Sequence, residues 1–419
     1  MPKKKLLMIL GAGSSVAHGM PSVSDLDEKM LRWSREWARS HPEDDNYYEK
    51  VYQNALGYGG HDVPQERRLA NFEQCLGDLI DLAHWLRGAP HGNPLRQWVA
   101  NGRFPPALRF SKGIGGNNCQ CFRVLSQAHF LLTRLANHMR ETCLKLDITT
   151  SAFSAYRTVI DGLRERFAVG ILNLNYDNIS LSAWPGAFTG FSTSGDFEPD
   201  RLHERRDWGF IYHLHGSVYH RLVNNVGPGI YWESDLTKVI TGEDSDGRLN
   251  DIRSDRRLFP RTTLIAGGAK PEQLLGEPYQ SLYSAAVRHM HEADAMVLGG
   301  FGLGDAHVTF ALQACWLATR RQIPLMILTK SKRDDAPLLW RNGTFAARLR
   351  KSFGIKDQQF WEKQAASFWL RHIVDTAAFE VSDTSERPLA AWHGGFHEAS
   401  TRLEPIARWL NGERDALPR

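Results

Sequence analysis

The sequence predicts an α/β fold: a doubly wound, Rossmann-like parallel sheet with a large helical insertion after its first strand and a helical C-terminal extension. Short apolar runs that end at Gly, Asn or Thr recur along the chain, at residues 6–10, 169–174, 295–298 and 325–328. Longer segments between them carry apolar residues at spacings of three and four, as amphipathic helices do. Strands that alternate with helices are typical of a parallel sheet.

The first apolar run, residues 6–10, is too short for a helix and predicts a buried strand. Ser24 can cap the next helix, whose apolar residues fall at helical spacing: Leu26, Met30, Trp33 and Trp37. Three further segments show the same periodicity: residues 69–86, 125–143 and 153–163. Together they predict a helical insertion over about residues 24–166. Within it, residues 87–119 are rich in Pro, Gly and Asn and predict a long loop or a lid.

The chain is predicted to have two parts. Residues 1–335 are expected to form the α/β domain, in which the charged segment 241–257 is an exposed linker. Beyond it the sequence becomes helical in pattern and rich in aromatic residues, with five tryptophans: Trp340, Trp361, Trp369, Trp392 and Trp409. We expect residues 336–419 to be a helical extension whose aromatic residues are either buried core or a surface for assembly.

The composition excludes several classes of protein. The 419 residues carry 51 basic and 47 acidic side chains, and a net charge of +4 does not indicate a nucleic-acid partner. Lys3, Lys4 and Lys5 precede an apolar run of only five residues, which is too short for a signal peptide. No run approaches the roughly 18 residues of a membrane span. We therefore expect a cytoplasmic protein with no membrane partner.

The cysteines do not predict a metal site. Five are scattered along the chain without a Cys-x-x-Cys pair, so neither a disulfide framework nor a zinc ribbon is indicated. Cys119 and Cys121 could bind a metal together with histidines, but free thiols are the simpler interpretation. No metal is expected.

The segment Gly11-Ala12-Gly13-Ser14-Ser15 follows the first strand and has the composition of a phosphate-binding turn. Its glycines permit a tight bend and a close approach of backbone to a pyrophosphate, at which the serine hydroxyls can point. The third glycine of the dinucleotide fingerprint is absent at its usual spacing, and no acidic residue follows a second strand. A plain strand-to-helix turn is therefore the alternative.

Two later segments place polar residues where ligands of open α/β sheets bind. Asn175 and Asp177 follow a predicted strand and can contact a sugar, a water or a carboxamide, or cap the next helix. In the segment from His213 to Ser217 the two histidines point to the same side, and His215, beside Gly216, could act as a general base. The alternative is that the two histidines are two ligands of a metal ion, although no Asp, Glu or Cys lies at ligand spacing beside the pair. His213 is predicted to be structural.

The segment from Gly299 to Asp305 again follows a strand. Gly300 and Gly302 can allow a nucleotide to contact backbone, and Asp305 either binds a ribose hydroxyl or caps the following helix. Lys270 could contact phosphate, with a solvated lysine as the default.

Together these segments resemble the sirtuin-like proteins, in particular the bacterial sirtuin-like NAD hydrolases of antiphage defence systems. The first glycine turn with Gly19-Met20-Pro21-Ser22 is similar to the family's glycine-rich opening and its Ile-Pro element. Asn175-Tyr176-Asp177 matches its Asn-x-Asp, His215-Gly216 its catalytic His-Gly, and Gly300-Phe301-Gly302-Leu303 its late nucleotide loop. The resemblance spans about residues 5–330.

The resemblance implies cleavage of the nicotinamide–ribose bond of NAD. Asp177 would hold the carboxamide, Asn175 would position the ribose or the attacking water, and His215 would act as base. The implied NAD-binding residues are Gly11, Ala12, Gly13, Ser14, Ser15, Pro21, Gly216, Gly300, Gly302 and Asp305. The chain lacks the cysteine quartet and the Asp-Phe-Arg of deacetylating sirtuins, which favours water over a peptide as the acceptor.

Two other functions stay open. One is protein deacylation or ADP-ribosyl transfer, and the other is a non-catalytic subunit that binds NAD or ADP-ribose. A hydrolase of an abundant cofactor would be toxic if always active, so we expect control by assembly, as a homo-oligomer. By resemblance alone, a HerA-like ATPase or a short Argonaute is a further expected partner.

Overall fold

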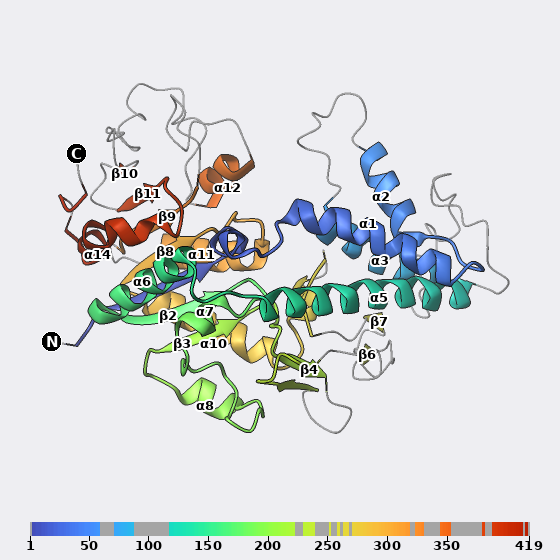
Figure 1. Ribbon diagram of the computed structural model, residues 1–419, viewed down its shortest axis with the longest axis horizontal. Coiled ribbons are helices and arrows are strands. Elements are labelled where there is room, and N and C mark those ends of the chain that lie inside the picture. Colours follow the sequence, from blue (N-terminus) through green and yellow to red (C-terminus); the bar gives the residue numbers. More distant parts are fainter. Residues whose placement is uncertain are drawn as a thin grey trace. The chain divides into compact units, whose positions relative to one another are not determined.

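The computed structural model contains two compact units, each described by itself (Figure 1). The sheet unit comprises Met1–Met20, Lys145–Ser217 and Glu277–Arg419, and the helical unit comprises Pro21–Leu144 and Val218–Gly276. The structure describes residues 2–58, 71–87, 117–222, 229–238, 251–252, 258–259, 263–267, 270–318, 323–330, 344–352, 379–381, 388–413 and 415–417. The predicted loop or lid at 87–119 and the predicted linker at 241–257 lie largely outside these residues.

The sheet unit is built on a seven-stranded sheet in the order β10-β11-β9-β8-β1-β2-β3. Its strands are β1 (Lys5–Leu10), β2 (Ala168–Asn173), β3 (Phe210–His213), β8 (Ala295–Gly299), β9 (Leu325–Leu328), β10 (Phe379–Val381) and β11 (Leu389–Trp392). The pairs from β11 through to β3 are parallel, whereas β10 pairs antiparallel with β11. This arrangement confirms the predicted doubly wound, Rossmann-like sheet.

Strand β1 lies inside the sheet because it pairs with a parallel strand on each side, β2 and β8. Its residues Leu6–Leu10 are fully buried, which explains the uninterrupted apolar run. The register sets Leu10 beside both Asn173 and Gly299, so the carboxyl ends of three strands meet. The chain leaves β1 toward β2 and β3 on one side, and β8 and β9 continue the other side. Ligands of open α/β sheets bind at such a switch point.

Helices and short turns complete the sheet unit. The helices are α6 (Ser151–Arg166), α7 (Ile179–Ala183), α8 (Pro199–Glu204), α10 (Tyr279–Glu292), α11 (Ala306–Ala318), α12 (Thr344–Ser352) and α14 (Leu403–Leu410). Two 3-10 turns, η1 (Ala12–Ser14) and η2 (Val16–His18), follow β1 directly. The predicted helix at 153–163 is α6. It buries the four apolar residues that predicted it: Phe153, Tyr156, Ile160 and Leu163.

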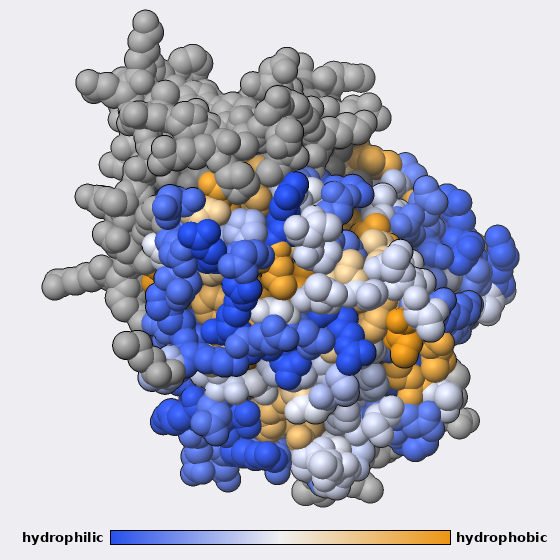
Figure 2. All heavy atoms as spheres, turned by 60° about the vertical axis from the view of Figure 1, so that its left-hand side comes forward, coloured by the Kyte–Doolittle hydropathy of each residue, from blue (hydrophilic) through white to orange (hydrophobic). Residues whose placement is uncertain are grey.

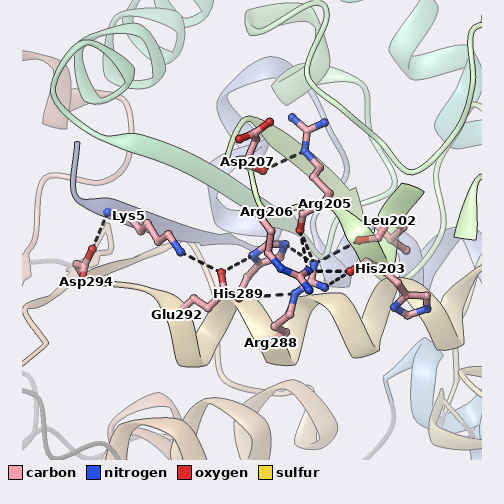
Figure 3. A network of polar contacts seen from close by, with 10 residues as sticks. All are labelled: Lys5, Leu202, His203, Arg205, Arg206, Asp207, Arg288, His289, Glu292 and Asp294. Atoms are coloured by element: carbon pink, nitrogen blue, oxygen red, sulfur yellow. Dashed lines mark hydrogen bonds and ion pairs between the residues drawn. The ribbon is translucent and has the colours of Figure 1, made fainter. Parts of the chain in front are cut away.

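A polar network holds α10 against the amino edge of the sheet (Figure 3). Arg288 donates hydrogen bonds to the carbonyl oxygens of three residues at the end of α8: Leu202 at 3.2 Å, His203 at 2.6 Å and Arg205 at 3.2 Å. Lys5 at the start of β1 pairs with Glu292 of α10 at 3.2 Å. These contacts anchor the edge of the sheet opposite to the strand ends that carry the predicted site residues.

The helical unit contains most of the predicted insertion, as Pro21–Leu144, together with a second segment, Val218–Gly276, whereas the end of the predicted insertion, including α6, belongs to the sheet unit. Its helices are α1 (Val23–Ser40), α2 (Tyr47–Tyr58), α3 (Phe72–Arg87), α5 (Asn117–Leu144) and α9 (Lys270–Gln273). Two antiparallel strand pairs accompany them: β4 (His220–Leu222) with β5 (Ile230–Trp232), and β6 (Asp251–Ile252) with β7 (Leu258–Phe259). The helices predicted at 69–86 and 125–143 correspond to α3 and α5.

The predicted helix cap at Ser24 is wrong, because α1 begins at Val23 and its N-cap lies two residues before Ser24. Its N-cap is Ser22, whose hydroxyl accepts from the Asp25 backbone N–H, while the Asp25 carboxylate accepts from the Ser22 N–H at 2.8 Å. This reciprocal pair is a capping box, which satisfies two backbone donors at once. Two serines two residues apart can each cap a helix, and the acidic residue three positions after Ser22 decides between them.

The C-terminal extension differs from the expected helical segment because it also supplies strands. Besides α12 and α14 it contributes β11, which pairs with β9, and β10, which pairs with β11. Trp392 and Trp409 are buried in this unit. Trp340, Trp361 and Trp369 lie outside the described residues. The described part of the extension therefore completes the sheet of the sheet unit.

The surface and the cysteines add two observations. Figure 2 shows a face on which hydrophilic residues predominate, with smaller hydrophobic areas between them. Within the described ranges, none of the helices combines the length and apolar character that crossing a bilayer requires. Cys75, Cys121, Cys143 and Cys315 are buried and form no disulfide.

Candidate functional site

Two glycine turns pack against each other at the carboxyl edge of the sheet. The Gly11 N–H donates to Gly299 O at 2.9 Å, and the Gly13 N–H donates to Gly300 O at 3.0 Å. A Cβ atom at Gly13 would lie 2.9 Å from Gly300 Cα, and one at Gly300 would lie 2.2 Å from Ser14 N. The structure thus gives these glycines a role that the sequence did not predict, the backbone contact between the two turns.

Gly302 is different, since a Cβ atom there would have no neighbour within 4 Å. Its carbonyl oxygen accepts a hydrogen bond from Arg348 at 3.2 Å. The next residue, Leu303, is buried and adopts a positive φ of 53°, which is unusual for a residue other than glycine. Of these glycines, Gly302 is the one beside which the structure leaves space for another molecule.

The serine hydroxyls of the first turn make hydrogen bonds within the protein. Ser14 is buried, and its hydroxyl donates to Gly11 O at 2.8 Å. Ser15 is 2% exposed, and its hydroxyl is engaged by Asn175 and Asp177. Ala12 lies in the 3-10 turn between them. The turn therefore connects the first strand to the Asn-x-Asp segment.

A chain of hydrogen bonds links Asn175 to Asp177 through Ser15. The Asn175 amide donates to Gly11 O at 3.0 Å and to Ser15 Oγ at 2.9 Å, and the Ser15 hydroxyl donates to the Asp177 carboxylate. Asp177 also accepts from the Ile179 N–H at 3.1 Å. Burial raises the pKa of Asp177, and these hydrogen bonds oppose the rise. Since both donors of Asn175 are directed inward, its Oδ1 is the atom that can accept from a ligand.

His213 lies in the interior at the end of β3. Its Nε2 is 3.2 Å from Asn173 Nδ2, and burial lowers its pKa to about 4. The side chain is therefore neutral at physiological pH. This environment is that of a structural histidine, as the sequence analysis expected.

His215 forms the centre of a cluster with His307 and Asp305. Its Nε2 lies 2.9 Å from His307 Nε2 and 3.9 Å from Asp305 Oδ1, and the side chain is 2% exposed. Its Nδ1 faces Leu174 O at 3.3 Å, which fixes the proton on Nδ1 and leaves a lone pair on Nε2. In the histidine pair His307 is then the donor. Tyr283 donates to His307 O at 2.6 Å and anchors the start of α11.

His307 is the residue that sequence reasoning missed. The chain separates it from His215 by 92 positions, so no spacing pattern links the two. The available signal was its place two residues after Asp305, at the start of the helix that follows the late glycine turn. Asp305 directly precedes that helix, as expected of a capping residue.

The other predicted residues fall in different places. Gly216 has a positive φ of 97°, which explains the glycine after His215. Pro21 is the first residue of the helical unit. The prediction that Lys270 is solvated is wrong, because its side chain is buried and pairs with Glu73 at 2.8 Å inside the helical unit.

Comparison with known proteins gives a match for the segment that contains most of these residues. Residues 169–346 match the family model of the SIR2-like domain. A Sir2 homologue in complex with NAD is similar over 84% of this chain and 89% of its own, at 12% identity and a TM-score of 0.34. A Sir2 homologue mutant in complex with 2′-O-acetyl ADP ribose is similar over 86% and 95%, at 12% identity and a TM-score of 0.33. Sir2Tm bound to a propionylated peptide is similar over 84% and 95%, at 13% identity and a TM-score of 0.30. No curated protein matches the sequence significantly.

Proposed function

We propose, from the premise that residues 169–346 form a SIR2-like domain, that this chain hydrolyses NAD to nicotinamide and ADP-ribose. The observation that carries the proposal is that Asn175 and Asp177 contact the first glycine turn, and that His215 contacts the carbonyl oxygen of Leu174, the residue before Asn175. These contacts lie at the carboxyl ends of β1, β2 and β3. Open α/β sheets bind nucleotides at this kind of switch point.

The nucleotide would bind along the two glycine turns. The free space beside Gly302 allows a phosphate or a ribose to approach the backbone closely. Asp305 lies three residues further on, with its side chain only partly exposed, and can accept from a ribose hydroxyl. Gly11, Gly13 and Gly300 would contribute by holding the two turns together.

The reaction breaks the bond between nicotinamide and C1′ of the ribose and forms a bond from a water oxygen to the same carbon. Positive charge develops on the ribose in the transition state, which is oxocarbenium-like. Asn175 Oδ1 can accept from a ribose hydroxyl or from the water, and its oxygen dipole stabilises the developing charge. The amide cannot turn away, because Gly11 and Ser15 hold its nitrogen.

His215 would receive the proton of the attacking water. Its lone pair is on Nε2, the nitrogen that accepts from His307 in the structure, so the His307 N–H must give way to the water. The products are nicotinamide, ADP-ribose and one proton. Asp177, whose buried carboxylate lies beside Ser15, would bind the nicotinamide carboxamide.

Water is the proposed acceptor because the sequence has five scattered cysteines and no quartet for the zinc module of deacetylating sirtuins. The alternative is deacylation or ADP-ribosyl transfer, which turnover that depends on an acyl-lysine or a protein substrate would reveal.

By the resemblance alone, we also propose a role as the toxic effector of an antiphage defence system. Its activity would be controlled by homo-oligomerisation or by a partner of the HerA-like ATPase or short Argonaute type.

The test is to incubate the purified protein with NAD, alone and with its genomic neighbours, and to quantify nicotinamide and ADP-ribose by mass spectrometry. Asn175→Ala should lower nicotinamide release by at least about a hundredfold. His291→Ala is the matched control, because His291 is exposed near the end of α10, at the opposite edge of the sheet. Tight NAD binding without nicotinamide release under any condition would refute hydrolysis and favour a binding subunit.

A further inference from the structure

We infer that His215, Asp305 and His307 form a site for a divalent transition-metal ion of the zinc class, and that the bound ion blocks NAD hydrolysis. The first part rests on the geometry of the three side chains. The second part rests also on the proposed function, because it requires His215 to be the base.

The three side chains converge on one point. The two Nε2 atoms are 2.9 Å apart, Asp305 Oδ1 is 3.9 Å from His215 Nε2, and all three ligand atoms lie within 4.8 Å of one another. Ligands at bond lengths of about 2.1 Å are about 3.0 to 3.4 Å apart when they are adjacent around one ion. The nitrogen pair, at 2.9 Å, is about 0.1 Å below this range. The carboxylate must approach the two nitrogens by less than about 2 Å, which a change in its side-chain torsions provides.

The ligands are oriented for coordination. His215 directs its Nδ1 at Leu174 O, and a backbone carbonyl partner of this kind is the usual outer contact of a metal-bound histidine. His307 begins α11, where Tyr283 holds its backbone and where Thr309 N donates to Asp305 O at 2.9 Å. Both sides of the cluster are therefore fixed by backbone contacts. His307 needs only to move its proton from Nε2 to Nδ1 to become a ligand.

The donor set determines the class of ion. Two neutral imidazoles and one carboxylate suit Zn²⁺, Co²⁺ or Ni²⁺, and three protein ligands leave positions open for water. Mg²⁺ and Ca²⁺ prefer oxygen ligands alone. In the sequence, no acidic residue lies at ligand spacing beside the pair His213 and His215. The fold supplies Asp305 and a second histidine from the late glycine turn.

A bound ion would inhibit the enzyme because it takes the lone pair of His215 Nε2. That lone pair is the one that must receive the proton of the attacking water. Hydrolysis itself needs no metal, so a chelator should leave turnover unchanged in metal-free protein and raise it in protein that carries the ion. The fold should not depend on the ion, since hydrogen bonds already connect the cluster.

Binding is tested directly by titrating chelator-treated full-length protein with Co²⁺ and recording the visible d–d absorption, with Mg²⁺ as the negative control. One ion per chain should bind, without the intense band of a cobalt–thiolate bond, and Zn²⁺ should displace it. His307→Ala and Asp305→Asn should each raise the Kd for Co²⁺ at least about tenfold, whereas His291→Ala should not. Absence of saturable binding, a thiolate band, or an unchanged Kd in both ligand variants would overturn the site. If one variant fails to fold, the other and the wild-type spectrum decide.

Inhibition is measured separately, as nicotinamide release at increasing Zn²⁺ concentration. Turnover should fall at least about tenfold at saturating Zn²⁺, with half-inhibition near the Kd measured by competition with Co²⁺. Saturating Zn²⁺ that leaves turnover unchanged or raises it would overturn the inhibitory role. If the protein binds cobalt but never releases nicotinamide, the metal site is supported and the proposed function is refuted. If it releases nicotinamide but binds no cobalt, only the metal site is refuted.

Discussion

Gly300→Ala and Gly302→Ala place the same methyl group two residues apart in the late glycine turn, at positions with opposite surroundings. At Gly300 φ is +60°, and the new Cβ atom would lie 2.2 Å from Ser14 N and 2.7 Å from Gly13 Cα. At Gly302 the new atom would meet nothing within 4 Å. The pair therefore separates the packing of the two turns from contact with a ligand.

The structure gives the size of each effect. A left-handed conformation costs a residue with a Cβ about 1–2 kcal/mol, and overlap in a packed region costs about 1–3 kcal/mol more. Gly300→Ala should therefore destabilise the sheet unit by about 2–5 kcal/mol, which lowers the Tm by roughly 5–15 °C. Gly302→Ala should leave the Tm within about 2 °C of the wild type. It should instead raise the Kd for NAD about tenfold, because the methyl group occupies the space beside the turn.

Thermal unfolding followed by circular dichroism measures the first effect, and calorimetric titration with NAD measures the second. The titrations are made in an Asn175→Ala background, so that NAD is not consumed. A wild-type Tm in Gly300→Ala would refute the packing of one turn on the other. An unchanged Kd in Gly302→Ala would refute the placement of the nucleotide.

Three further predictions test the site and the stability of the sheet unit. The double variant Asn175→Ala/His215→Ala should release nicotinamide scarcely more slowly than the slower single variant, because the two residues act in one transition state; losses that multiply would contradict this. Arg288→Ala should lower the free energy of unfolding in urea by about 1–3 kcal/mol, since it removes three hydrogen bonds to carbonyl oxygens, of which those of His203 and Arg205 keep Arg206 as a donor. Arg157→Ala on the exposed face of α6 should change it by less than about 0.5 kcal/mol. Equal effects of the two would refute the role of the network. Burial lowers the pKa of His289 to about 4 in the folded protein, below the value of about 6.5 in the unfolded chain. The neutral side chain therefore contributes about 3 kcal/mol to the free energy of unfolding above pH 6.5, and this contribution is lost as the pH falls toward 4. His289→Phe should remove this part of the pH dependence, and an unfolding free energy with the same pH profile as the wild type would contradict it.

The fold was predictable where burial leaves a continuous apolar run. Residues 6–10 lie inside the sheet, with a parallel strand on each side and buried on both faces, so they contain no polar position that could obscure the strand. Strand β11 shows the opposite case. Its sequence Leu389-Ala390-Ala391-Trp392 has no β-branched residue and suits a helix as well as a strand. Its parallel pairing with β9 (Leu325–Leu328), which is distant in sequence, makes it a strand together with its pairing with β10, so a local pattern could not reveal it.

The site was predictable in its residue types but not in its contacts. A glycine next to a strand indicates a close approach of backbone, and the structure shows such an approach at Gly13 and Gly300. The sequence could not show that the approaching group is another turn of the same chain. His307 was hidden for the same reason, because its partner His215 belongs to a different strand end.

The two glycine turns and the polar residues between them behave as one unit, which explains how the site can couple two events. Gly11 O receives the Asn175 amide and Gly13 N–H binds Gly300 O, so the first turn is joined both to the Asn-x-Asp segment and to the late turn that carries Asp305 and His307. At the centre, His215 has its Nδ1 committed to Leu174 O and its Nε2 hydrogen-bonded to His307. In the proposed reaction a proton from water would compete with the inferred metal ion for Nε2. Metal binding and the proposed NAD hydrolysis should therefore be linked with opposite sign, and an ion concentration equal to the Kd should halve the turnover.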